Sequence, residues 1–309
     1  MNIHFIPDTI FARDYIELSG RNFTNYKIYV YGERLGFVKE ESANVKIVNK
    51  LCFSYLDNLE NDKLFIHGFY ISDVVRFLFF NSFRIDFSKV VLIIWGADLY
   101  GNYFALMDGK PHIKTRIYEL MKTVFIRKCR MFMTFAAPDF DLLCHIYKTK
   151  GKQFDCLYPS SVNKEQLKKL VDNSEKKYHN TVNILVGNSA TKTNNHIEVL
   201  NWLSRFKKNN IKIYCPLSYG DKGYASEVAE YGRKMFGDKF VPVLNYMKSD
   251  EYSVFLNKMD IAVFNNNRQQ ATANIEILGF LGKKVFIRSD ITMWGHYVVR
   301  EGCKFFDTK

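Results

Sequence analysis

Short apolar runs alternate with longer stretches of mixed apolar and polar residues along the whole chain. The short runs of the first half are rich in β-branched and aromatic side chains and predict strands at NIHFIP, KIYVY, KLFIHG, KVVLIIWG, RMFMTF and QFDCLYP. The longer stretches predict helices at about 72–80, 112–129 and 138–148. This alternation is typical of βα units around a parallel sheet.

The same pattern begins again after a polar, charged stretch at 160–180. The second half predicts strands at TVNILVGNS, IKIYCPLSY, KFVPVL, MDIAVFNNN and KKVFI, with helices near 194–207, 225–236, 249–258 and 272–281. A chain of 309 residues fits two domains better than one. We therefore predict an α/β protein with a Rossmann-like domain over 1–160, a linker over 161–180, and a second Rossmann-like domain over 181–309.

Composition and charge narrow the class of protein. Hydrophobic residues make up 47% of the chain, which supports two buried cores, while the longest apolar runs fall short of the roughly 18 residues that span a bilayer. The first residues do not resemble a secretion signal, and six cysteines without a CxxC pair predict free thiols and no zinc site. The net charge of +12 predicts an anionic partner, which leaves nucleic acid, an acidic lipid surface and a phosphorylated substrate open. No nucleic-acid-binding motif is present, so we expect no nucleic-acid partner.

Three polar residues in the first half lie where predicted strands end. Asp98 follows the buried run VVLIIW, His67 closes KLFIH, and Asp8 follows NIHFIP. Ligands of parallel α/β sheets bind beyond the carboxyl ends of the strands, so these side chains are candidates for chemistry. The alternative for Asp98 is a helix N-cap or turn aspartate.

In the second half, the run TVNILVGNS ends in Gly187, Asn188 and Ser189, ahead of a predicted helix. Small residues with exposed N–H groups at such a place suit a phosphate. No GxGxxG or P-loop motif is present, so an ordinary βα turn rich in capping residues is the alternative.

A second strand end carries Arg268, Gln269 and Gln270, directly before the helix predicted at 272–281. A guanidinium among amide side chains at a helix N-terminus suits a diphosphate, because its donors form a fork and the helix end adds partial positive charge. Glu276, one turn further on, would accept from a ribose hydroxyl; the alternative is an exposed acid.

The predicted helix at 112–129 has an apolar stripe and a basic remainder. The stripe consists of Ile113, Ile117, Leu120, Met121 and Val124. Two interpretations stand: a core helix with a solvated basic face, or an amphipathic helix on an anionic bilayer. In the second interpretation, the candidates for contact with the membrane or an acceptor diphosphate are Lys114, Arg116, Lys122 and Arg127.

The chain resembles a known family in several stretches that occur in order along most of its length. These are IHGFY (66–70), WGADLY (95–100), LVGNS (185–189) with NNHIEVL, PLSYG (216–220), and RQQ (268–270) followed by ILGFLGKKVFI and Trp294. They resemble the TDP-N-acetylfucosamine:lipid II N-acetylfucosaminyltransferases of enterobacterial common antigen synthesis, also described as 4-alpha-L-fucosyltransferases. WGADLY, LVGNS and RQQ at similar separations carry most of the resemblance.

The resemblance implies a GT-B glycosyltransferase whose two Rossmann-like domains face a central cleft, with no cofactor and no obligatory metal. It implies a nucleotide-sugar donor, dTDP-linked, on the C-terminal side, and an undecaprenyl-diphosphate-linked acceptor on the N-terminal side. Gly187, Asn188 and Ser189 match the VGNS motif, and residues 268–270 match RQQ, so both become candidates for the donor diphosphate. Tyr219 of PLSYG becomes a candidate for the nucleoside or sugar, whereas the ribose role of Glu276 rests on its position alone.

An enzyme of this kind needs a group that assists deprotonation of the acceptor hydroxyl. Asp98 is the first candidate, followed by His67 and Asp8. A lipid-linked acceptor implies a peripheral protein on the cytoplasmic side of the inner membrane, where anionic lipids meet the basic helix. The alternatives are a GT-B transferase with another nucleotide sugar and a soluble acceptor, and a binding protein of nucleotide fold without turnover.

Overall fold

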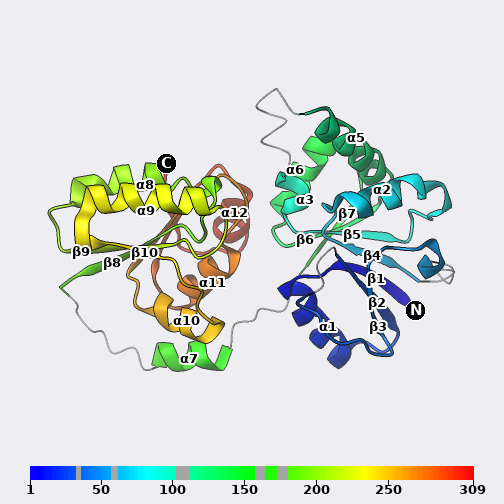
Figure 1. Ribbon diagram of the computed structural model, residues 1–309, viewed down its shortest axis with the longest axis horizontal. Helices are drawn as coiled ribbons and strands as arrows, with labels where there is room; N and C mark the ends of the chain where they lie inside the picture. The colour runs from blue at the N-terminus through cyan, green and yellow to red at the C-terminus, as the bar shows by residue number, and fades with distance from the viewer. Residues whose placement is uncertain (33–35, 57–61, 102–111, 157–163, 173–179) are drawn as a thin grey trace. The chain divides into compact units, whose positions relative to one another are not determined.

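The computed structural model describes residues 1–32, 36–56, 62–101, 112–156, 164–172 and 180–309 (Figure 1). The chain forms two compact units, Met1–Pro159 and Ser160–Lys309. The end of the predicted strand QFDCLYP and two parts of the predicted linker, 161–163 and 173–179, lie outside the described residues.

The first unit contains a parallel sheet of seven strands in the order β3-β2-β1-β4-β5-β6-β7. The strands are β1 (Asn2–Pro7), β2 (Tyr26–Tyr31), β3 (Val45–Val48), β4 (Leu64–His67), β5 (Val90–Ile94), β6 (Met131–Thr134) and β7 (Lys152–Asp155). The helices are α1 (Ile10–Asn22), α2 (Ser72–Phe80), α3 (Ala97–Tyr100), α5 (Ile113–Lys128) and α6 (Pro138–Tyr147).

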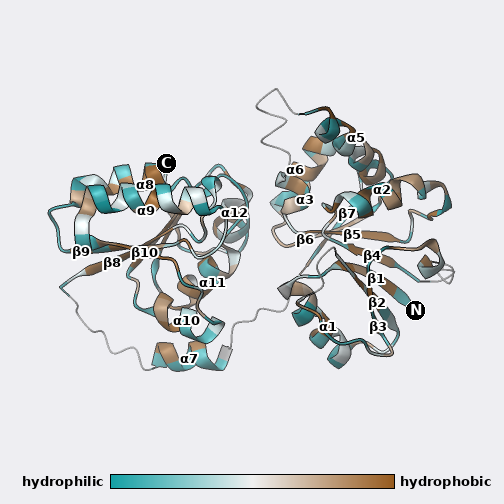
Figure 2. Cartoon of the chain, viewed as in Figure 1, coloured by the Kyte–Doolittle hydropathy of each residue, from teal (hydrophilic) through white to brown (hydrophobic). Residues whose placement is uncertain are grey.

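Helices cover both faces of this sheet. Figure 1 shows α1 on one face and α2, α5 and α6 on the other. Each face has its own apolar cluster: Ile6, Ile28 and Val30 pack with α1, while Phe5, Leu64 and Leu92 belong to the larger cluster beneath α2 and α5. The central strands are apolar on both faces because both are covered, and Figure 2 shows these strands in the hydrophobic colour.

The second unit contains a parallel sheet of six strands in the order β10-β9-β8-β11-β12-β13. The strands are β8 (Val182–Val186), β9 (Ile211–Pro216), β10 (Phe240–Val243), β11 (Ile261–Phe264), β12 (Lys284–Ile287) and β13 (Phe306–Asp307). The helices are α7 (Lys164–Asp172), α8 (His196–Leu203), α9 (Lys222–Phe236), α10 (Ser249–Asn257), α11 (Thr272–Phe280) and α12 (Thr292–Trp294), which continues as a π-helix over Gly295–Arg300. Figure 1 shows α8 and α9 on one face and α10 and α11 on the other.

Both sheets have the strand order of a doubly wound nucleotide-binding fold. The first three strands of such a sheet run outward to one edge, and the fourth strand lies on the other side of the first, across the switch point. In the first unit this switch point lies between β1 and β4, and in the second between β8 and β11. The carboxyl ends of these strand pairs are therefore the places to examine for ligand sites.

The sequence predicted most of these elements but missed several. Helix α1, strands β3 and β13, and the short helix and π-helix at 292–300 were not predicted. Part of the segment predicted as a linker is α7, which packs against α10, where Gln166 Nε2 donates to the Asp250 carbonyl at 3.1 Å. Among the described residues, no helix is long and apolar enough to cross a bilayer.

Candidate functional site

A network of amide and hydroxyl side chains joins the two strand ends at the switch point of the second unit. Gln270, in the loop after β11, lies with its Nε2 3.0 Å from Asn188 Oδ1, 3.0 Å from Ser189 Oγ and 3.0 Å from Thr191 Oγ1. Its Oε1 accepts from the Thr193 hydroxyl at 2.7 Å. An amide nitrogen has only two hydrogens, so these three acceptors share them. Gln270 thus joins the loop after β11 to the loop after β8.

The loop after β8 is also held from within. Asn194 is fully buried; its Oδ1 accepts from the Asn188 amide at 3.1 Å, and its Nδ2 donates to Thr191 Oγ1 at 2.8 Å and to the Ser189 carbonyl at 3.0 Å. Gly187 has a φ of +68°, and a Cβ at this position would lie 2.4 Å from His196 Nε2. Only glycine therefore fits this turn without displacing His196.

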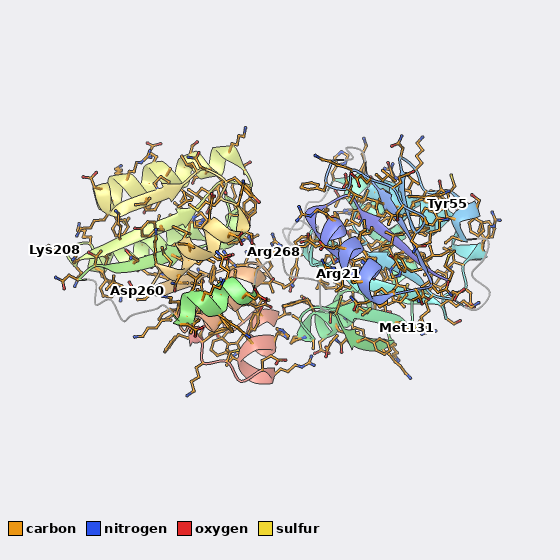
Figure 3. The ribbon with its side chains drawn as sticks, turned by 90° about the horizontal axis from the view of Figure 1, so that it is seen from below. Arg21, Tyr55, Met131, Lys208, Asp260 and Arg268 are labelled. Carbon is orange, nitrogen blue, oxygen red and sulfur yellow. The ribbon has the colours of Figure 1, made fainter. Side chains whose placement is uncertain are left out.

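Arg268 supplies the positive charge of this site. Its Nε lies 3.4 Å from Thr193 Oγ1, and its Nη1 lies 3.4 Å from the Gln269 carbonyl. Figure 3 shows Arg268 at the opposite end of the unit from Lys208 and Asp260, which lie near the amino ends of the strands. The predicted diphosphate residues Arg268, Gln270, Asn188 and Ser189 are therefore in one cluster, whereas Gln269 contributes only its backbone oxygen.

Tyr219 borders the same cluster from the loop after β9. Its hydroxyl accepts from Asn188 Nδ2 at 2.9 Å, while 57% of the residue stays exposed. Desolvation raises the pKa of its hydroxyl, and the nearby Arg268 guanidinium acts in the opposite direction. The hydroxyl is fixed while the ring faces solvent, which suits stacking against a planar ligand group.

Glu276, on α11, is engaged by a neighbouring side chain. Its Oε1 accepts from the Tyr297 hydroxyl at 3.2 Å, and desolvation raises the pKa of the carboxyl group. This contact fixes one carboxylate oxygen on the π-helical segment of the same unit.

Sequence reasoning missed Thr191, Thr193 and Asn194 as members of this network. Their signal was the polar run NSATKTNN directly after the strand. Thr193 meets Gln270 across 77 positions of the chain, a proximity that the run itself does not contain.

The candidates of the first unit do not gather in the same way. Asp8, after β1, is partly exposed, and its carboxylate accepts from the backbone amides of Gly36, Phe37 and Val38, the last at 2.9 Å. It thereby fixes the loop that follows β2 at the switch point of this sheet. Asp8 is the one catalytic candidate of the three that keeps contact with solvent.

His67 is fully buried, together with a second histidine. His67 Nε2 lies 3.1 Å from His4 Nδ1, and the Tyr15 hydroxyl lies 3.2 Å from the same atom of His4. Burial lowers the pKa of His4 to about 4 and that of His67 well below its usual value. Both imidazoles are therefore neutral near pH 7, and both are buried.

Asp98, the first candidate for the base, is buried at the turn after β5. Asp98 is 1% exposed, and its carboxylate accepts from the Trp95 amide at 3.0 Å and the Phe69 amide at 3.2 Å. Burial raises its pKa, while Lys122 and these amides act in the opposite direction. Asp98 thus ties the turn after β5 to the turn after β4, which is the structural alternative recognised in the sequence.

Lys122 must also be removed from the predicted membrane contacts. It is 1% exposed, and its ammonium donates to the Asp98 carbonyl and lies 3.4 Å from Glu119 Oε1. Tyr147 of α6 completes this cluster, since its hydroxyl donates to Glu119 Oε2 at 3.2 Å. A buried lysine with these partners holds α5 to the turn after β5 and does not meet a lipid. Lys114, Arg116 and Arg127 remain exposed.

Within the described ranges, no group of three or more His, Cys, Asp or Glu side chains is arranged to bind a metal ion.

The family model described as 4-alpha-L-fucosyltransferase, glycosyl transferase group 56, matches residues 39–300. The chain belongs to this family. It is therefore a glycosyltransferase. No curated protein matches the chain significantly.

Solved structures share the fold of this group 56 chain at low sequence identity. The UDP-forming trehalose-phosphate synthase of Burkholderia xenovorans has a TM-score of 0.64 and 7% identity, covering 99% of this chain and 88% of the other. WaaG, a glycosyltransferase of lipopolysaccharide biosynthesis, has a TM-score of 0.62 and 9% identity, covering 99% and 86%. The E. coli trehalose-6-phosphate structure with UDP-2-fluoro glucose bound has a TM-score of 0.63 and 7% identity, covering 99% and 88%. These similarities establish the GT-B fold.

Proposed function

We propose that this glycosyltransferase moves an amino-deoxy sugar such as N-acetylfucosamine from a dTDP-linked donor to a glycan on polyprenyl diphosphate. The reaction belongs to bacterial surface polysaccharide synthesis, on the cytoplasmic side of the inner membrane. The network around Gln270 carries the proposal, because it places amide, hydroxyl and guanidinium groups together at the switch point of a nucleotide-binding fold. The family description, which names fucosyl transfer, supports a deoxy sugar.

The departing diphosphate is the group that this network suits best. Negative charge develops on the leaving diphosphate as the sugar is transferred, and fixed donors in place before the reaction stabilise it. Arg268 supplies charge and the Ser189 and Thr191 hydroxyls supply neutral donors, while the Gln270 amide holds both hydroxyls in place. The exposed ring of Tyr219 would stack against the base, and Glu276 would accept from the ribose.

On the acceptor side we assign the first contact to Asp8. Its partly exposed carboxylate lies at the switch point of the first sheet, whereas His67 and Asp98 are buried. A carboxylate within hydrogen-bond reach of the acceptor hydroxyl would take its proton as the hydroxyl attacks the anomeric carbon.

The donor assignment is tested by calorimetric binding of dTDP to wild type and Arg268→Ala. A charge-assisted hydrogen bond contributes about 1.5–3 kcal/mol, so we expect affinity to fall about 10- to 150-fold. Lys208→Ala removes an exposed positive charge at the other end of the same unit and serves as the control. Equal affinity of Arg268→Ala and Lys208→Ala would remove Arg268 from the donor site.

A further inference from the structure

Helix α5 presents an apolar ridge to solvent. Ile113, Ile117 and Leu120 are 61%, 52% and 63% exposed, and they recur at the spacing that places residues on one side of a helix. Half-buried Val124 continues the same line. Single exposed apolar side chains are common on protein surfaces, but a row of them on one helix indicates an interaction surface.

The opposite side of α5 faces the core and carries charged residues, whereas a helix packed on a core usually buries apolar ones. It buries the ion pair of Glu119 and Lys122 beside Met121 and Phe125. Of the five members of the predicted apolar stripe, Met121 alone is buried, so the stripe does not face the core as the first of the two interpretations required. The buried charges are satisfied by Tyr147 and the Asp98 carbonyl, so they do not need the solvent side.

Basic side chains flank the ridge. At 100° per residue, Arg116 and Arg127 lie along one side of it and Lys114 and Lys128 along the other, all exposed. Glu119 is the one acid in α5, and it is buried, so the exposed side of the helix carries positive charge alone.

A further apolar side chain lies beside the C-terminal end of the helix. Lys128 Nζ lies 3.3 Å from the Ser82 hydroxyl, in the 3-10 turn Ser82–Arg84. The next residue, Phe83, is 82% exposed. Asp73, an exposed acid on neighbouring α2, is paired with Arg76, since Asp73 Oδ1 and Arg76 Nη1 lie 3.8 Å apart.

We propose that the ridge of α5, with Phe83, docks on the surface of a bilayer that contains anionic phospholipids. The apolar side chains enter the boundary between headgroups and acyl chains, and the basic flanks meet the lipid phosphates. A second copy of the chain fits this surface poorly, because a two-fold contact would bring two positively charged flanks together. The inference rests on the proposed function in one respect: a lipid-linked acceptor is held at such a surface.

The test is sedimentation of the full chain with vesicles of phosphatidylcholine alone, or with about one third phosphatidylglycerol, at low and high salt. Ile117→Ser/Leu120→Ser removes the ridge, and Lys114→Gln/Arg116→Gln removes flanking charge. Lys208→Gln/Lys212→Gln and Val299→Ser change exposed residues of the second unit in the same way and are the matched controls. Thermal unfolding and dTDP binding are measured for every variant.

We expect wild type and controls to bind the anionic vesicles, and the binding to weaken at high salt. Two lost positive charges should weaken it about 30-fold, and loss of the ridge about tenfold or more. Normal unfolding temperature and dTDP affinity in these variants would confirm that only docking was lost.

Equal vesicle binding by ridge variants and controls would overturn the proposal, while leaving the transfer function to its own tests. No binding of wild type to any vesicle would do the same. If the ridge substitutions instead changed a dimer into a monomer at unchanged vesicle binding, the surface would belong to a second copy.

Discussion

Replacing Gln270 by alanine should uncouple the loops after β8 and β11. The side chain accepts one hydrogen bond from Thr193 and donates two at a time to Asn188, Ser189 and Thr191. Each bond contributes about 1 kcal/mol net, and partial exposure reduces the sum to about 2 kcal/mol. For a unit of this size, that loss lowers the melting temperature by about 4–8 °C.

Donor affinity should fall as well, because donor binding must then also supply the free energy that orders the two loops. A cost of about 1.4 kcal/mol corresponds to tenfold weaker binding. The assay is thermal unfolding of the protein with and without dTDP, combined with calorimetry. Because a ligand that binds only the folded state raises stability by mass action, the shift produced by dTDP should shrink in Gln270→Ala.

Two variants make this test specific. Gln269→Ala alters the neighbouring residue, which enters the network only through its backbone oxygen, and should behave as wild type. Gln270→Glu keeps the acceptor for Thr193 but adds a negative charge, so it should lose more donor affinity than Gln270→Ala. If Gln270→Ala matched Gln269→Ala in both melting temperature and dTDP affinity, the network would have no role in either folding or donor binding.

Two further predictions concern buried groups. In Asp98→Asn, one carboxylate oxygen becomes a donor facing the Trp95 and Phe69 amides, which costs about 2–3 kcal/mol. The melting temperature of the first unit should therefore fall by about 4–12 °C, while dTDP affinity stays normal. Full stability of that variant with abolished transfer would restore Asp98 as the base. The lowered pKa values of His4, His67 and His196 mean that the unfolded chain, with histidine pKa values near 6.5, binds more protons than the folded one below that pH. Stability is therefore complete above about pH 6.5 and is lost as pH falls, by about 1 kcal/mol per histidine between pH 6.5 and 5.5, measured by urea unfolding. His4→Phe should remove the contribution of one histidine from this dependence, whereas exposed His145→Gln should leave it unchanged. A flat wild-type profile would contradict the burial argument.

The sequence predicted the strands well because the central strands of parallel sheets are buried on both faces and form continuous apolar runs, as VVLIIW does. Helix α1 was missed because two of the residues it buries are Ala12 and Ser19, which contribute little to an apolar pattern. The sequence left the direction of α5 open between two interpretations, because its inward charges, Glu119 and Lys122, are satisfied by groups from α6 and the turn after β5. Periodicity within one helix contains no information on such partners.

The candidate site was predictable to the extent that it lies at strand ends. The positions of Ser189, Arg268 and Gln270 followed from strand and helix patterns together with the rule for parallel sheets. Their mutual contacts did not, because Gln270 and Asn188 are 82 residues apart. The burial of Asp98 could not be predicted either, since the Phe69 amide that binds its carboxylate comes from a different strand end.

The central claim, sugar transfer from a nucleotide donor to a lipid-linked glycan, is tested most directly by mass spectrometry of the lipid product. Purified protein is incubated with dTDP-N-acetylfucosamine and an undecaprenyl-diphosphate-linked glycan. The account predicts that the glycolipid gains one sugar for each dTDP released, and that Arg268→Ala lowers this rate while Lys208→Ala does not. An unchanged glycolipid, with the sugar recovered on a water-soluble acceptor or with no dTDP released, would contradict it.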